Sequence, residues 1–111
     1  MSDLTAADAA DDQFRIVARS EDAGVLVVAG GEIDLANADR FRAVLTAAAE
    51  PSRALTVDMT RVDYCDSAAI HALFASAEKC ALTVLISPAG PLTRLFAISS
   101  LNEVATIQHA S

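Results

Sequence analysis

The sequence predicts an α/β domain in which helices pack on a mixed sheet of four to five strands. Short runs of apolar and β-branched residues alternate with segments whose apolar residues recur at helical spacing. A polar turn separates the first two runs and indicates a hairpin, whereas the later runs are separated by helices, as crossovers require. Together these features indicate one sheet with helices on it.

The first two predicted strands are Phe14–Ala18 and Gly24–Ala29, joined by the polar residues 20–24. Residues 30–34 are then expected to form a connection. A third strand, at Ala54–Met59, alternates apolar and polar residues and precedes a polar segment at residues 60–63. Two more strands complete the prediction, a nearly continuous apolar one at Ala81–Ile86 and a short last one at Val104–Ile107.

Three helices are predicted, each from apolar residues at helical spacing behind a start signal. Asn37 is the expected N-cap of the first helix, which ends near Glu50. Asp66 is the expected N-cap of the second, which closes at Cys80. Pro91 begins the third. The residues expected to face the core are Phe41, Val44, Leu45, Ala48, Ile70, Leu73, Phe74, Ala77, Leu92, Leu95 and Phe96.

Composition limits the classes of partner. The chain has 111 residues, of which 53% are hydrophobic, so it can bury one domain core. Its net charge of −7 would repel nucleic acids and anionic membranes. Residues 1–12 contain four acidic and no basic residues, and we expect them to form a disordered acidic tail ahead of a single domain at residues 13–111. No apolar stretch approaches the ~20 residues that cross a bilayer.

The cysteines and histidines predict neither a disulfide nor a metal site. Cys65 and Cys80 flank a predicted helix whose ends would lie roughly 18 Å apart, well beyond the ~7 Å that a disulfide allows. With only His71 and His109 in addition, no spacing resembles a zinc site, and no cofactor is expected. Free thiols suit a reducing compartment, so we expect a cytoplasmic protein.

Three segments carry a family resemblance. They are Gly31-Glu32-Ile33-Asp34, then Tyr64-Cys65-Asp66-Ser67-Ala68-Ala69-Ile70, and then Ile86-Ser87-Pro88 followed by Arg94-Leu95-Phe96. In order and spacing they resemble the G-E-[LI]-D, D-S-x-G-[LI] and S-P…R-L-F segments of STAS anti-sigma-factor antagonists. The resemblance extends from about residue 13 to 107. It implies a STAS fold and a bacterial, non-enzymatic regulator of sigma-factor-dependent transcription.

The resemblance also implies a mechanism. The unmodified protein would bind an anti-sigma factor of the serine protein kinase type, which would release it by phosphorylating Ser67, and a phosphoserine phosphatase would reset it. The family match places Asp34, Asp66, Ser67, Ala68, Ala69 and His71 at the partner-binding surface. No metal or catalytic residue is implied, and we expect a monomer or weak dimer.

Elementary electrostatics supports Ser67 as a phosphorylation site. The first turn of a helix tolerates a phosphate, because its N–H groups and the positive end of the helix dipole face that position. The added charge, about −1.5 to −2, would lie next to Asp66 and repel an acceptor surface. Ala68, Ala69 and His71 depart from the family pattern, and His71 lies four residues after Ser67, on the same side of the helix.

Two other functions stay open. The departures allow a STAS adaptor without phosphorylation, of the kind that supports a lipid-transport ATPase or a signalling assembly. A serine hydrolase would use Ser67, His71 and an aspartate, but Cys65-Asp66-Ser67-Ala68-Ala69 lacks both glycines of a nucleophile elbow. Cys65 is expected to be a packing residue, because acidic neighbours raise the pKa of its thiol.

Overall fold

The structure is a computed structural model that describes residues 14–22, 24–51, 53–88 and 90–109. It contains a five-stranded sheet of order β1-β2-β3-β4-β5, which confirms the predicted mixed α/β architecture. The acidic tail predicted for residues 1–12 lies outside the described residues. The strands are β1 (Phe14–Glu21), β2 (Gly24–Ile33), β3 (Ala54–Cys65), β4 (Leu82–Ile86) and β5 (Thr106–His109). The helices are α1 (Ala38–Ala48), α2 (Ser67–Ala77), α3 (Leu92–Ser99) and the 3₁₀ turn η2 (Leu101–Glu103).

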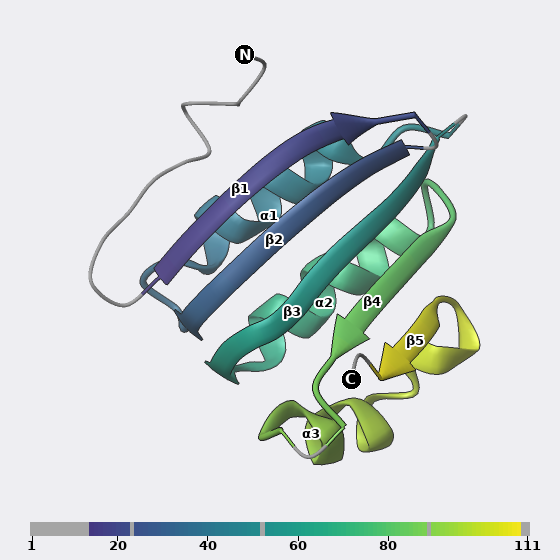
Figure 1. Cartoon of the computed structure of the whole chain (residues 1–111). Helices are drawn as coiled ribbons and strands as arrows, with labels where there is room; N and C mark the ends of the chain where they lie inside the picture. The colour runs from purple at the N-terminus through teal and green to yellow at the C-terminus, as the bar shows by residue number, and fades with distance from the viewer. Residues whose placement is uncertain (1–13, 23, 52, 89, 110–111) are drawn as a thin grey trace.

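Strand directions follow from the connections. β1 and β2 form the predicted antiparallel hairpin, in register from Phe14 opposite Gly31 to Glu21 opposite Gly24. β2, β3, β4 and β5 run parallel to one another, so the chain crosses over through helices between them. Figure 1 shows α1 and α2 behind the sheet and α3 beyond the end of β4. No helix among the described residues covers the opposite face of the sheet, which we call the open face.

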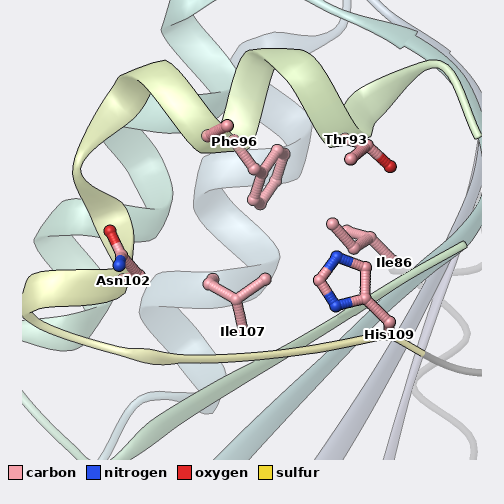
Figure 2. Close-up of a pocket in the computed structure, with 7 residues that line it drawn as sticks. Ile86, Thr93, Phe96, Asn102, Ile107 and His109 are labelled. Carbon is pink, nitrogen blue, oxygen red and sulfur yellow. The ribbon is translucent and has the colours of Figure 1, made fainter. Parts of the chain in front are cut away.

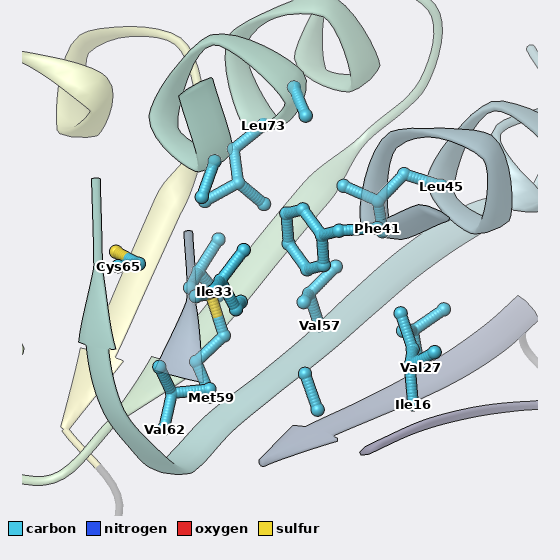
Figure 3. Packing of buried hydrophobic residues seen from close by; sticks show 14 of the residues in the cluster. Ile16, Val27, Ile33, Phe41, Leu45, Val57, Met59, Val62, Cys65 and Leu73 are labelled. Carbon is cyan, nitrogen blue, oxygen red and sulfur yellow. The ribbon is translucent and has the colours of Figure 1, made fainter. Parts of the chain in front are cut away.

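The core lies between the sheet and the helices α1 and α2 (Figure 3). Alternate residues of the strands point into it, as period-two patterning requires. Phe41 and Leu45 of α1 and Leu73 of α2 meet this layer and are fully buried, as their helical spacing predicts. Burying each such side chain stabilises the fold by about 1.5–3 kcal/mol. The strand residues of this layer include Phe14, Ile16, Val27, Ile33, Leu55, Val57, Met59 and Val84.

Three strands are longer than predicted. β1 continues to Glu21, and the expected connection at residues 30–34 continues β2 as far as Ile33. The polar segment at residues 60–63 lies within β3, which ends at Cys65. The added parts of β2 and β3 pair with each other through register shifts between Val28 and Gly30 and between Gly31 and Glu32. The shifts break the regular alternation, and none of the described helices covers the open face. Polar residues are therefore tolerated in these strands, and the hydrophobic pattern of the sequence does not reveal where the strands continue.

The last strand begins two residues later than predicted. Val104 does not start it, because its N–H bonds the carbonyl of Leu101 at 3.0 Å and closes η2. β5 therefore spans Thr106–His109 and pairs with β4 from Thr83 opposite Thr106 to Ile86 opposite His109. Within the described ranges, no helix is long and apolar enough to span a membrane.

Candidate functional site

Ser67 is the first residue of α2, directly after β3 and the cap residue Asp66. The Oδ1 atom of Asp66 accepts the N–H of Ala68 at 3.0 Å, which confirms the predicted N-cap. Ser67 is exposed, and its hydroxyl makes no hydrogen bond to any residue that the structure describes. The position therefore presents a free hydroxyl at the positive end of a helix.

Asp34 lies beside this turn because β2 and β3 are parallel neighbours that end together. Ile33 is opposite Cys65 in the ladder, and the N–H of Asp66 bonds the carbonyl of Ile33 at 3.2 Å. Two carboxylates thus follow adjacent strand ends, as expected at the carboxyl edge of parallel strands. Asp34 also has a local structural role, since its Oδ1 accepts the N–H of Ala36 at 2.9 Å.

His71 and Ser67 line one shallow groove between α2 and α3, with a volume of about 300 Å³. We call it the α2/α3 groove. Its lining is mainly apolar. On the α2 side, the hydroxyl of Ser67 and the imidazole of His71 are the polar groups. The expected placement of both residues on one side of the helix is therefore found. The remaining lining residues are Ile70, Phe74, Leu95, Ile98 and Ser99.

Ala68 and Ala69, both expected at the partner surface, differ in position. Ala68 is half-buried beside the cap. Ala69 has no exposed surface, because its methyl group points from α2 into the core. A partner therefore cannot touch the Ala69 side chain, and this expectation needs correction. The physical reason is that Ala69 and Leu73, four residues apart, share the buried face of the helix.

A family model described as "Mlab, STAS domain" matches residues 16–108. The chain belongs to the STAS domain family. The resemblance of its three segments to STAS proteins is thereby confirmed.

Among solved structures, this STAS domain is similar to the crystal structure of an anti-sigma factor antagonist from Mycobacterium paratuberculosis. The two chains are 23% identical, with a TM-score of 0.79 over 92% of this chain and 91% of the other. At that identity the likeness shows a shared fold. A comparison with curated protein sequences finds no match.

Asn37 has a different role in the STAS domain from the one predicted. It occupies the N-cap position of α1, but its side chain makes no capping hydrogen bond. Instead, its Oδ1 accepts the N–H of Asp34 at 3.0 Å, and its Nδ2 donates to the carbonyl of Glu32 at 2.9 Å. Only 5% of Asn37 is exposed. A buried amide can serve as donor and acceptor at once, and here it holds the turn that carries Asp34.

Exposed apolar side chains near the site were not singled out from the sequence. Leu35 follows Asp34 and is 81% exposed, whereas Ile98 lines the α2/α3 groove and is 75% exposed. Tyr64, two residues before Asp66, is also exposed. For Leu35, an apolar residue in an otherwise polar turn was the available signal. For Ile98, the available signal was an apolar residue in the third predicted helix that does not belong to the residues expected to face the core.

Cys65 is a packing residue, as predicted. It is buried in the core (Figure 3), and desolvation, assisted by the charge of Asp66, raises the pKa of its thiol from 9.0 to about 12. Burial also raises the pKa of Cys80. Both thiols are free, as the predicted helix length requires. Neither cysteine has the lowered pKa of a nucleophile.

A second hollow lies between α3 and the strands β4 and β5 (Figure 2). Its volume is about 370 Å³, and Ile86, Phe96 and Ile107 provide most of its apolar wall. The hydroxyl of Thr93 at its rim already donates to the carbonyl of Ser87 at 3.0 Å. Ser67 and His71 do not line it. Within the described ranges, no group of His, Cys, Asp and Glu side chains is arranged to hold a metal ion.

Proposed function

We propose that this STAS domain is an anti-sigma-factor antagonist whose binding to an anti-sigma factor is switched off by phosphorylation of Ser67. The observation that carries the proposal is the free, exposed hydroxyl of Ser67 at the start of α2, where it opens onto the α2/α3 groove. The partner would be an anti-sigma factor with serine protein kinase activity, and a phosphoserine phosphatase would restore the binding form.

The proposed switch is electrostatic. A phosphate on Ser67 would add a charge of about −1.5 to −2 next to Asp66, in a chain whose net charge is already −7. The N-terminal end of α2 tolerates that charge, so the helix should stay folded. The partner surface would then meet a strongly anionic edge, and binding would weaken without refolding.

The proposed contact surface comprises the groove and the polar residues beside it. We assign to it Asp34, Asp66, Ser67, Ala68 and His71, and we leave out the buried Ala69. The apolar wall of the groove would contribute the desolvated centre of the interface, and the two carboxylates would form its polar rim. Like charges that face each other across an interface oppose binding, so one added charge at this rim can disrupt the complex.

The experiment compares Ser67→Ala, Ser67→Asp and a control, Ser20→Asp, which adds the same charge at an exposed residue of β1. Affinity is measured by calorimetry against the anti-sigma factors of the native host, and each candidate kinase is tested by intact mass. We expect Ser67→Asp to bind at least tenfold more weakly, about 1.4 kcal/mol, while the other two bind like the wild type. Equal affinity for all four proteins, with unchanged circular dichroism, would exclude the switch.

A STAS adaptor that is not phosphorylated is the second candidate. The observation that favours it is His71, which occupies the groove beside Ser67 where the family pattern has a small residue. Such an adaptor would use the same groove constitutively. Tight binding of Ser67→Asp to a partner captured by the wild type, with no phosphate found on Ser67 in the native host, would select this function.

A further inference from the structure

Two arginines flank a glycine on the open face of the sheet. Arg15 of β1 is opposite Gly30 of β2, and Gly30 is in turn opposite Arg61 of β3. Ile16 and Ala29, their chain neighbours, are buried under the helices, so Arg15 and Gly30 face the other way. Both arginines are exposed. The three residues therefore form one row across adjacent strands, with no side chain at its centre.

The row encloses a hollow of about 270 Å³, which we call the Gly30 hollow. Val17 and Val28 lie opposite each other in the ladder, are half-buried, and form an apolar floor beside it. Adjacent strands lie about 4.8 Å apart, so the Cα atoms of the two arginines are separated by roughly 10 Å. Their long side chains can converge over the glycine from opposite sides.

Neither guanidinium has a partner within the described part of the chain. By contrast, Arg42 pairs with Asp39 at 2.8 Å, and Arg53 donates to the carbonyl of Gly24 at 3.0 Å. Three acidic residues are nearby. Asp58, opposite Val28, already accepts hydrogen bonds from the N–H and hydroxyl of Thr60, whereas Glu32 and Asp63 are exposed two residues beyond Gly30 and Arg61. None of these carboxylates forms an ion pair with the row.

The backbone does not require a glycine at position 30. Gly31 has a φ of 91°, a conformation that favours glycine, whereas Gly30 lies outside that region. A Cβ added at Gly30 would meet only ordinary contacts, 3.5 Å from the Cβ of Arg61. Glycine inside a strand often marks a bulge or a close approach of another group to the backbone, and Gly30 follows the register shift after Val28. Because position 30 carries no side chain, the space between the two arginines is open to a ligand.

We propose that the Gly30 hollow binds a small phosphate monoester, with Arg15 and Arg61 donating hydrogen bonds to its oxygens and Val17 and Val28 contacting its apolar part. A phosphate monoester offers three acceptor oxygens and up to two charges, so it can satisfy two planar guanidinium groups at once. A carboxylate offers only two oxygens and one charge. This site is separate from the α2/α3 groove, and it stands whether or not Ser67 is phosphorylated.

The test is an NMR titration of the full chain with phenyl phosphate, inorganic phosphate and benzoate. We expect saturable shifts at the amides of Gly30 and Arg61, and at least fivefold tighter binding of phenyl phosphate than of the other two, because only phenyl phosphate combines three oxygens with an apolar ring. The absence of a saturable shift up to about 10 mM phenyl phosphate would overturn the proposal.

Variants localise the site. Arg15→Gln and Arg61→Gln should each weaken binding at least tenfold, whereas Arg19→Gln, on the same face and strand as Arg15, should change it less than twofold. Gly30→Val should fill the hollow and remove binding while circular dichroism stays unchanged, and Glu32→Gln should strengthen binding. If Arg19→Gln weakened phenyl phosphate binding as much as Arg61→Gln, the ligand would be attracted only by the general positive charge of this face and not by a defined site. Undiminished binding by folded Gly30→Val would likewise refute the site.

Discussion

Ser67 and His71 lie one turn apart on α2 and line the same groove against α3. The imidazole is therefore within the reach of a group attached to the serine hydroxyl, on a helix whose backbone fixes their spacing. Phe74 continues the groove along the same side of the helix. A phosphate on Ser67 would consequently have a histidine as its neighbour inside an apolar surround.

That neighbourhood predicts that phosphorylation of Ser67 changes the environment of the His71 ring. A ring N–H of His71 can donate a hydrogen bond to a phosphate oxygen one turn away. The measurement is the NMR chemical shift of the His71 ring protons at one pH in the unmodified and the phosphorylated protein, with His109, which lines the other hollow, as the internal control. Equal shifts of the His71 ring in the two forms would show that the imidazole does not contact the phosphate.

The same pairing predicts how a His71 variant behaves. An imidazole that donates a hydrogen bond to the phosphate partly offsets its charge, so removal of the ring should enlarge the difference in partner affinity between unmodified and phosphorylated protein. We expect His71→Ala to enlarge that ratio severalfold, as measured by calorimetry. An unchanged ratio would show that His71 does not moderate the switch.

Ile98 should contribute to partner binding without contributing to stability. It is 75% exposed on the wall of the α2/α3 groove, so Ile98→Ser removes apolar contact area from the proposed interface but little from the core. We expect at least tenfold weaker binding and a change in the free energy of unfolding below about 0.5 kcal/mol.

Val104 provides the matched control for Ile98. It is also an exposed aliphatic residue, 51% accessible, but it follows η2 and does not line the groove. Val104→Ser should therefore leave partner affinity unchanged. If both serine variants bound as tightly as the wild type, the groove would not be the docking surface.

The side chain of Asn37 should contribute to the stability of the fold. Asn37→Ala removes the acceptor for the N–H of Asp34 and the donor to the carbonyl of Glu32, so two part-buried backbone groups lose their side-chain partner. Because each such loss costs about 1 kcal/mol, urea denaturation should show a decrease of about 2 kcal/mol in the free energy of unfolding. Asn102→Ala, at an exposed residue, should change it by less than about 0.5 kcal/mol. Similar values for the two variants would contradict the role of Asn37.

The two thiols should differ in reactivity. With a pKa of about 12, Cys65 carries almost no thiolate at pH 8 and is buried, so iodoacetamide should modify Cys80 first and Cys65 only in urea. The folded pKa lies above the unfolded value of 9.0, so its contribution to stability is complete below pH 9 and is lost as the pH rises toward 12. Relative to Cys65→Ala, the free energy of unfolding should therefore fall above pH 9. Rapid native labelling of Cys65 would contradict its burial.

Much of the fold follows from local patterns in the sequence. The hairpin, the three helices and the inward-facing residues were predictable because a buried layer imposes its period on each element. The cap at Asp66 and the side-by-side placement of Ser67 and His71 were predictable for the same reason, since both follow from the geometry of a single helix. Family resemblance added the identity of Ser67 as a candidate switch.

Features that involve two distant segments were decided only by the tertiary structure. The ends of β2 and β3 are polar in sequence and form strands because each supplies the other's hydrogen-bonding partners, with irregular register. The bonds of Asn37 are local, to Asp34 and Glu32, but they depend on how the turn at the end of β2 folds back, which the cap position alone does not reveal. Arg15, Gly30 and Arg61 meet because three strands align them, although up to 31 residues separate neighbouring members of the row. Sequence periodicity reports which face of one element is buried, whereas contacts between elements depend on how the sheet is assembled.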